Sequence, residues 1–505
     1  YPKLIQTAGP DITAPSTYRI STFARTVTRG APAELIGYRA DFRKDFATAA
    51  PAYIKVGVKF NDNKRYDRRW NENYTWLGAD GIPNTADDSM ALYTMGSYRL
   101  SKGDYGPFPF LPAVDVKEKV TGDRPGYWGQ TAAQAYASYN SSNASNVDID
   151  EMTRAAYVSG HVNLGKVRIL SGVRVERTNT DAVAWVRNQT AAWGGNSIGG
   201  ASFLPSDVVT DLARAERSFV ARRKTENTHQ GVFPGLHIIF EPRDGFIARA
   251  SYNKSITRPN TNAILPTLTV NEERQPPTIV VGNPELKPYM SDNFEVNIEK
   301  YFEPVGLVSV GVFLKEIKDY FRSFDDVVGA AGIDGSGLYA GYVRTTSQNV
   351  GAARIRGMEF NYQQQFSFLK GVWRNFGLTG NFTYIQTEGN FGTLTLTRKL
   401  PNMTPRSANA GLSYVNQRLQ IRVLANYRGR TFVGTSGTLD YVTEPLLKVD
   451  LKLQYAFTKR YSAELNVENL TAQPGQEYVA EANSRLRFIK QNPGTSFIAG
   501  VTGRF

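Results

Sequence analysis

The segment "LKVDLKLQYAF", Leu447 to Phe457, decides the fold. Its apolar residues occupy every second position from Leu447 to Phe457, and Lys448, Asp450 and Lys452 lie between them. Side chains of a β-strand alternate between the two sides of the sheet, so this pattern predicts a strand with one apolar face and one polar face.

The same alternation recurs along the whole chain. It is found in "AYIKVGVKFN" from Ala52, "KVRILSGVRVE" from Lys166, "FEVNIE" from Phe294, "FGLTGNFTY" from Phe376 and "LQIRVLANYR" from Leu419. Counting such segments gives about sixteen strands, with boundaries uncertain by several residues. The chain is therefore predicted to be all-β.

The connections between these strands fall into two classes that alternate. Short links lie at 164–166, 241–245, 415–418 and 457–460. Long loops are expected at about 67–150, 181–224, 257–290, 321–349, 388–404 and 471–492. Strict alternation places all long loops at one end, as in outer-membrane barrels with short periplasmic turns and long extracellular loops. We therefore expect a transmembrane antiparallel up-and-down β-barrel over residues 17–505, after a lead-in at residues 1–16.

A soluble β-sandwich or a propeller would also alternate. Sandwich strands usually have about 5–6 residues, whereas several segments here exceed about 10, the length needed to cross a membrane at a tilt. A propeller would repeat every 40–50 residues or so, and no such repeat is found. The apolar faces therefore point to lipid on the outside and a polar lumen inside, which places Phe294 towards lipid and Glu295 towards the lumen.

Composition excludes several classes of protein. The 505 residues contain no Cys, so disulfides and thiolate metal sites are excluded. The formal charge of +13 is spread along the chain, which argues against a nucleic-acid partner. The 3 His residues and the absence of a nucleophile motif predict that the protein is not an enzyme.

The longest loop carries candidate ligand-binding and metal-binding residues. Flat aromatic rings can stack on sugars or on aromatic siderophores, although they could equally form a small core of the loop itself. The aromatic candidates are Trp70, Tyr74, Trp76, Tyr93, Tyr127 and Trp128. In "GADGIPNTADDS", 78–89, oxygen ligands for Ca²⁺ could come from Asp80, Asn84, Asp87 and Asp88, with an ordinary solvated acidic turn as the alternative. No other cofactor is expected.

Several segments together resemble the barrel of the TonB-dependent receptors, the energised importers of the Gram-negative outer membrane. They include "SITRPN" from Ser255, "GNPELKPYMSDNFEVNIEKYF" from Gly282, "IRGMEFNY" from Ile355, "LPNMTPRSANAGLSY" from Leu400 and "NVENLT" from Asn466. The resemblance covers about half of the chain, from Phe246 to the final Phe505, in the family's order and spacing.

The motif residues are expected to fix where strands begin and end. Prolines force extended backbone, and Asn or Ser side chains can bond unpaired backbone groups at a barrel rim. These residues are Gly282, Asn283, Pro284, Leu286, Lys287, Pro288, Asn293, Glu295, Asn469, Leu470 and Phe505.

The resemblance implies a 22-stranded barrel, a plug domain and a peptide that contacts the TonB–ExbB–ExbD system. No plug is recognisable here, so we expect the plug and about six strands to lie outside this sequence. The implied function is uptake of a scarce nutrient too large for porins, with a lean to oligosaccharides over iron siderophores. A passive porin and a surface scaffold are the alternatives. Outer-membrane lipid and lipopolysaccharide are expected partners, the latter through the basic segment 213–224, which could equally be a solvated helix.

Overall fold

The computed structural model describes most of the chain. The described residues are 9–11, 14–28, 33–89, 91, 96–98, 108–110, 126–144, 146–186, 216, 219, 221–265, 267–271, 276–333, 335, 337, 339–390, 399–436, 439–473, 476–481, 486–491 and 494–503.

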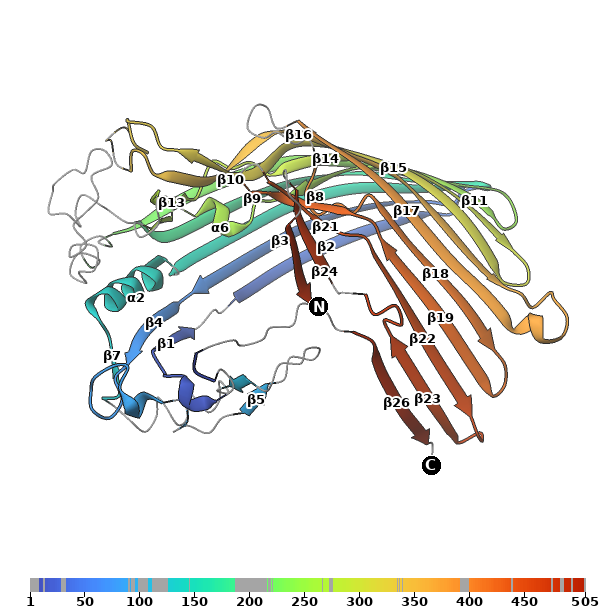
Figure 1. The fold of residues 1–505 in the computed structure, drawn as a ribbon. Coiled ribbons are helices and arrows are strands. Elements are labelled where there is room, and N and C mark those ends of the chain that lie inside the picture. Colours follow the sequence, from blue (N-terminus) through green and yellow to red (C-terminus); the bar gives the residue numbers. More distant parts are fainter. Residues whose placement is uncertain are drawn as a thin grey trace.

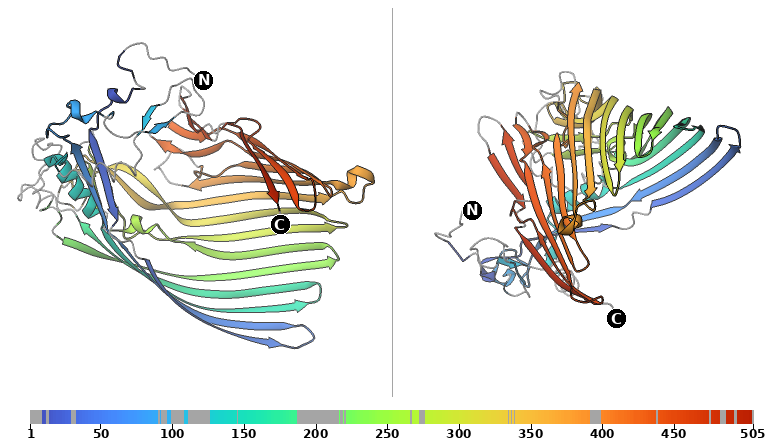
Figure 2. Two further views of the ribbon diagram at one scale, coloured as in Figure 1. Left: turned by 90° about the horizontal axis from the view of Figure 1, so that it is seen from below. Right: turned by 90° about the vertical axis from the view of Figure 1, so that its right-hand side faces the viewer.

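One large curved sheet of the barrel type dominates the fold (Figure 1, Figure 2). Its strands follow one another as antiparallel neighbours in chain order from β2 to β26. They are β2 (Ala33–Phe46), β3 (Ala52–Asp67), β8 (Val147–Leu164), β9 (Val167–Val186), β10 (Ala221–Arg243), β11 (Phe246–Thr257), β14 (Tyr289–Phe302), β15 (Gly306–Val327), β16 (Val343–Gln365), β17 (Phe376–Asn390), β18 (Arg406–Val415), β19 (Leu419–Arg428), β22 (Leu446–Ala456), β23 (Tyr461–Glu468) and β26 (Ser496–Gly503). The predicted all-β, antiparallel up-and-down fold is confirmed.

Short turns and long connections alternate as predicted. β8 and β9 are joined by Gly165 and Lys166, and similarly short turns join β10 to β11, β18 to β19 and β22 to β23. The long connections lie at the opposite end (Figure 1), which we call the loop side.

The loop side carries smaller elements of its own. β1 (Thr22–Thr28), β4 (Arg69–Trp76) and β7 (Trp128–Gly129) form one sheet, and β20 (Thr431–Ser436), β21 (Leu439–Thr443), β24 (Gln476–Glu481) and β25 (Leu486–Gln491) form another. The remaining short elements of the described chain are β5 (Gly96–Tyr98), β6 (Phe108–Phe110), β12 (Leu268–Asn271), β13 (Thr278–Val281), α2 (Ala132–Ala144), α6 (Thr261–Ile264), η1 (Pro15–Thr17), η2 (Ala86–Asp88) and, between β16 and β17, η5 (Gly371–Asn375).

Two loop boundaries differ from the expected ones. β15 continues past a bulge after Ile317 to Val327, and β16 begins at Val343, so about half of the expected loop 321–349 is strand. A further long connection between β19 and β22, which holds the β20–β21 hairpin, was not predicted. Its strands alternate too briefly to stand out from a turn-rich sequence.

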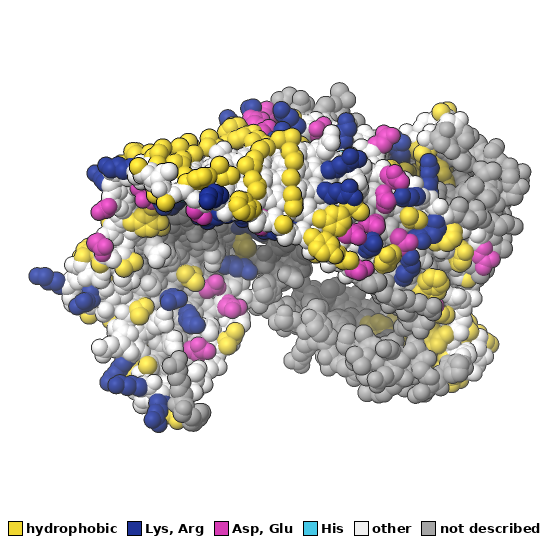
Figure 3. Space-filling view, turned by 180° about the vertical axis from the view of Figure 1, so that it is seen from behind, with side chains coloured by type: hydrophobic (Ala, Val, Ile, Leu, Met, Phe, Trp, Pro, Cys, Tyr) yellow, Lys and Arg dark blue, Asp and Glu magenta, His cyan; other side chains and the backbone are white. Residues whose placement is uncertain are grey.

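The outer face of the sheet is apolar and exposed. Val296 pairs with Ala250 of β11 and Val312 of β15, so the apolar positions of neighbouring strands form continuous rows. Phe294, Val296 and Ile298 are 46%, 47% and 46% exposed. A space-filling view shows this apolar band on the surface, bordered by charged side chains (Figure 3). Large exposed apolar surfaces require a partner, and hydrocarbon is the partner that fits a band on the outside of a barrel.

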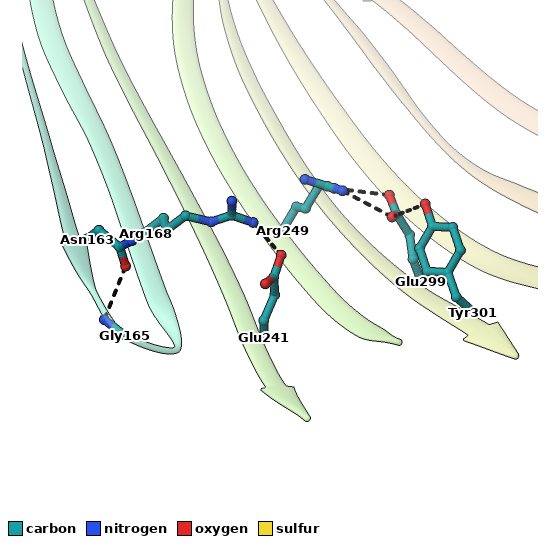
Figure 4. Close-up of polar contacts among 7 residues, drawn as sticks. All are labelled: Asn163, Gly165, Arg168, Glu241, Arg249, Glu299 and Tyr301. Atoms are coloured by element: carbon teal, nitrogen blue, oxygen red, sulfur yellow. Dashed lines mark hydrogen bonds and ion pairs between the residues drawn. The ribbon is translucent and has the colours of Figure 1, made fainter. Parts of the chain in front are cut away.

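The inner face is polar, and several of its charges are paired. At the short-turn end, Arg249 Nε and the Glu299 carboxylate are 3.0 Å apart, and the Tyr301 hydroxyl donates to the same carboxylate at 3.0 Å (Figure 4). Arg168 and Glu241 form an ion pair beside them (Figure 4). Glu295 lies on this face because it alternates with Phe294 and Val296.

Buried apolar clusters are small and lie towards the loop side. One contains Val147, Ile149, Ala182, Ala184 and Leu265, and another contains Ile317, Ala353, Ile355 and Leu400.

Within the described residues, no helix has the length and apolar character needed to cross a membrane.

Candidate functional site

The loop-side sheet β1–β4–β7 begins where β3 ends. β4 follows β3 after a single residue, Arg68, and helix α2 packs against it. The hydroxyls of Ser138 and Ser142 accept hydrogen bonds from the backbone N–H groups of Asn73 at 3.0 Å and Asn71 at 2.9 Å. Because Ser138 and Ser142 are one helical turn apart, a helix without an apolar stripe can dock on a sheet through polar contacts.

The candidate aromatic residues have different environments. Trp76 is 0% exposed, and its ring meets the edges of Tyr127 and Trp128 at centroid distances of 5.5 and 4.5 Å. Trp70 is 39% exposed, and Tyr74 is half-buried. The structure therefore brings three of the six into a small core of the loop. Tyr93 lies outside the described residues, and ligand stacking by this set stays a prediction.

The acidic turn, residues 78–89, is stabilised by hydrogen bonds from its own backbone N–H groups to its carboxylates. Asp87 accepts hydrogen bonds from the N–H of Ala79 at 2.5 Å and from the hydroxyl of Thr85. The Thr85 bond, the largest cause, and the Ala79 bond lower the pKa of Asp87, while desolvation opposes them. Asp88 is fully buried and accepts from the Thr85 N–H at 2.7 Å.

The remaining acidic-turn residues shape the chain reversal. Asp80 accepts from the Ile82 N–H at 2.8 Å, and Asn84 has a φ of 67°, a left-handed conformation that Asn tolerates well. Within the described part of the chain, no group of three or more His, Cys, Asp or Glu is arranged to hold a metal ion. The calcium site stays a prediction.

Calcium binding can be tested by calorimetric titration of Ca²⁺ into the purified protein. If the carboxylates at 80, 87 and 88 are ligands, Asp88→Asn will weaken Ca²⁺ binding by at least about tenfold, because a ligand charge is lost. Asp45→Asn, a carboxylate of the inner face, is the matched control. Absence of any Ca²⁺ binding by the unaltered protein contradicts the assignment.

The family motif at 282–288 anchors the loop between β11 and β14. The Asn283 side chain donates to the carbonyl of Ser347 at 2.9 Å and accepts from the Glu285 N–H at 3.0 Å. Leu286 is 0% exposed. A Cβ on Gly282 would lie 2.0 Å from the carbonyl oxygen of Leu265, so only glycine fits there.

A second asparagine joins this motif to the β15–β16 hairpin. Asn349 exchanges hydrogen bonds with the backbone of Lys287, both at 2.9 Å, and donates to the carbonyl of Asp319 at 2.7 Å. The Pro284 carbonyl accepts from Asn227 of β10, and Pro288 directly precedes β14. These contacts hold the 282–288 segment against β10 and the β15–β16 hairpin, and the structural role of the motif stays a prediction.

Asn293 is the centre of a polar ladder on the inner wall. Its amide donates to the Asn253 side chain at 3.0 Å and to Ser255 at 3.0 Å, and its oxygen accepts from Ser291 at 2.9 Å. Glu295, the next inner residue, is exposed to the lumen side.

Asn469 closes the loop-side end of β23. It has a φ of 57° and is nearly buried, and its amide donates to the carbonyls of Gln473 and Gly494, both at 2.8 Å. Leu470 is exposed. Phe505 lies outside the described residues.

A carboxylate between two arginines ties the loop-side ends of three strands together. Asp148 of β8 pairs with Arg68 and, at 2.7 Å, with Arg222 of β10. Burial raises the pKa of Asp148, but the hydrogen bonds and charges of Arg222 and Arg68 outweigh burial and lower it overall. Lys224 is likewise paired with Asp181 at 2.9 Å. Ala221–Lys224, the end of the predicted basic segment, is strand instead of a solvated helix, and two of its three cations, Arg222 and Lys224, are paired.

We expect this cluster to lose its stabilising effect at acid pH. Because the folded-state pKa of Asp148 lies below its ordinary 3.8, the contribution is complete above pH 3.8 and is lost as the pH falls through the folded value. The hydrogen-exchange protection factors of amides at the start of β8 and β10, which correct for the intrinsic effect of pH, should fall over that range. Asp148→Asn should exchange rapidly already at pH 7, and equal exchange in both proteins at pH 7 would contradict the assignment.

Below these elements, the inner wall of β2 and β3 is rich in basic side chains. Between residues 39 and 59, four basic and two acidic side chains project from it, Arg39, Arg43, Lys55 and Lys59 against Asp41 and Asp45. Tyr157 of β8 donates a hydrogen bond to Asp41 at 2.5 Å, and Tyr53 stacks on His161 at 5.1 Å. A polar solute leaving the loop side would meet this wall.

Sequence reasoning missed α2 and the Asp148 cluster. α2 has no apolar periodicity, so only its run of good helix formers could have indicated it. Arg68 and Arg222 are far from Asp148 in sequence, and no local pattern links them.

Comparison with known proteins identifies the family. The sequence matches the family described as "TonB dependent receptor-like, beta-barrel" over residues 6–470. A search of curated proteins gave no match. Members of the matching family are receptors and transporters of the Gram-negative outer membrane, not enzymes.

Solved structures share the fold. The ferric-catecholate import receptor Fiu from E. coli K12 has 14% sequence identity and a TM-score of 0.54, over 94% of this chain and 55% of that chain. The ferric citrate transporter FecA has 11% identity and a TM-score of 0.55, over 95% and 55%. The siderophore receptor PiuA from Acinetobacter baumannii has 15% identity and a TM-score of 0.51, over 93% and 56%. This chain thus spans little more than half the length of these proteins, and it belongs to the TonB-dependent receptor family.

Proposed function

We propose that this chain forms part of the barrel wall of an energised importer in the outer membrane of a Gram-negative bacterium. The family match over residues 6–470 carries the proposal. In this proposal the loop side captures a scarce nutrient, and the polar inner wall lines its path. In this proposal, import further requires a plug and a peptide that contacts the TonB–ExbB–ExbD system.

For the substrate, we favour an anionic iron chelate. The inner wall of β2 and β3 carries more basic than acidic side chains, and a positive surface attracts an anionic solute and speeds its capture. The neighbours named above import ferric catecholate and ferric citrate, in agreement with that chemistry. A neutral oligosaccharide, the substrate class that the sequence resemblance favours, gains nothing from this charge. The exposed Trp70 is the observation that favours it.

The importer can be tested by uptake in cells that express the full coding sequence. We expect radioactive ferric citrate or a ferric tris-catecholate to accumulate with intact TonB and not in a TonB deletion strain. Accumulation in both strains would indicate a passive porin. Surface binding without accumulation in either strain would indicate a scaffold. A glycan array and an iron-siderophore binding screen on the same purified protein separate the two substrate classes.

A further inference from the structure

The outer face of the sheet contains a hollow at the loop-side border of the apolar band. Its volume is about 1220 Å³. Side chains from alternate positions of seven neighbouring strands line it, Tyr38, Ala40, Val58, Phe60, Arg154, Ala156, Val175, Arg177, Gln230, Val232, Lys254 and Met290. These twelve residues share the face of Val56 and Val173, so most of the lining belongs to the outer face of the barrel. The five inner-face positions between them also contribute, Arg39, Lys59, Ala155, Glu176 and Gly231.

The hollow spans the change from apolar to polar surface. Along β9, Val173 and Val175 are followed on the same face by Arg177, and along β11, Tyr252 is followed by Lys254. Its floor, which includes Val58, is therefore at the depth of lipid chains. Its loop-side rim is at the depth of headgroups. Figure 3 shows Lys and Arg side chains gathered beside the apolar band of the outer face.

Three cations on this rim lack a carboxylate partner within the described residues. Arg154 donates to the sulfur of Met152 at 3.1 Å, and Arg177 donates to the amide oxygen of Asn179 at 3.2 Å. Asp292 is next to Lys254 across the β11–β14 ladder, but its carboxylate accepts from the Tyr252 hydroxyl at 2.9 Å.

The one acidic residue of the hollow does not neutralise these cations. Glu176 belongs to the inner face, where its carboxylate pairs with Arg174 and Arg258. The rim therefore carries three basic side chains above an apolar floor, with Asp292 opposite one of them, and this arrangement complements an anionic amphiphile.

Elsewhere on the same border, Arg354 of β16 is compensated by an ion pair with Glu316 at 2.6 Å. Arg354 therefore provides a matched control.

We propose that the hollow binds a membrane lipid of the loop-side leaflet whose headgroup carries phosphate. The phosphate oxygens would accept hydrogen bonds from Arg154, Arg177 and Lys254, and the acyl chains would cover Val58 and Val232. Arginine and phosphate form strong charge-assisted hydrogen bonds, above all where water is partly excluded. The inference rests on the proposed outer-membrane location but is independent of what the protein imports.

Native mass spectrometry of the purified protein in detergent, titrated with diphosphorylated lipid A, tests the proposal. The variant R154Q/R177Q/K254Q should bind this lipid at least about tenfold more weakly than the unaltered protein. R354Q should bind as the unaltered protein does. The folding of each variant is checked by the resistance of the barrel to unfolding by detergent during electrophoresis. If the triple variant does not fold, the three single variants are used in its place.

Three results would overturn the proposal. The first is unchanged lipid binding by the triple or single variants. The second is equal binding of lipid A from which both phosphates have been removed. The third is displacement of the lipid by glucose 1-phosphate, which would assign the site to a soluble phosphate. None of these measurements depends on uptake. A failure of the lipid proposal can therefore be distinguished from a failure of the importer proposal.

Discussion

Lysine in place of Val296 is expected to destabilise the barrel by about 2–4 kcal/mol, the cost of a basic side chain on the lipid face near the bilayer midplane. Val296 lies in the middle of β14, between Ala250 and Val312 of the neighbouring strands, and is 47% exposed on the outer face. A lysine there has no water within reach of its ammonium group. Equilibrium unfolding in urea in the presence of phospholipid vesicles measures the change.

The matched control is Glu295→Lys, one residue away. Its side chain is on the inner face, where lysine stays hydrated, so we expect a change within about 1 kcal/mol. Because the two positions are adjacent in one strand, a difference in stability between the two variants reports the face of the sheet and not the strand itself. Equal destabilisation by both substitutions, or by neither, would contradict lipid on one side and water on the other.

Alanine in place of Trp76 is expected to cost about 3–5 kcal/mol of local stability, the usual loss when a large buried aromatic side chain is removed. Trp76 is fully buried between Tyr127 and Trp128, and its backbone N–H donates to the carbonyl of Ser21 at 3.0 Å. It therefore joins β1, β4 and β7. We expect limited proteolysis to cut the variant near these strands while the barrel sheet stays protected.

Trp70→Ala is the control for this prediction. Trp70 is 39% exposed, so its removal should leave protease resistance close to that of the unaltered protein. Binding of a ferric tris-catecholate by both variants separates the two roles of the aromatic set. If Trp76→Ala kept its protease resistance and lost only ligand binding, the ring would be a stacking surface instead of a core residue.

The alternating pattern was sufficient to predict the barrel strands and the two kinds of connection. Leu447 to Phe457 is a strand as expected, within β22 and the turn after it. Such prediction works because a period of two follows from the local geometry of extended chain, and a membrane enforces it over many strands. The structural role of Asn283 and Asn469 could also be expected, because Asn bonds nearby backbone at chain reversals.

Local pattern could not predict which side chains meet across the loops. Asp148 lies between Arg68 and Arg222, which come from the start of the longest loop and from the end of the next one, and α2 is recognisable only by its docking on β4. The sequence does not distinguish among the six aromatic candidates of the longest loop. The tertiary packing shows that Trp76 is buried and Trp70 is exposed.

The sequence by itself determined that an all-β wall separates an apolar outside from a polar inside, because each residue's face is fixed by its position along its own strand. The tertiary structure alone decided where cations stay unpaired. Arg154, Arg177 and Lys254 come from three different strands, and their surroundings depend on the register between strands. Register brings distant residues side by side through backbone pairing, and the spacing of residues along one strand contains no information about its neighbour's charge.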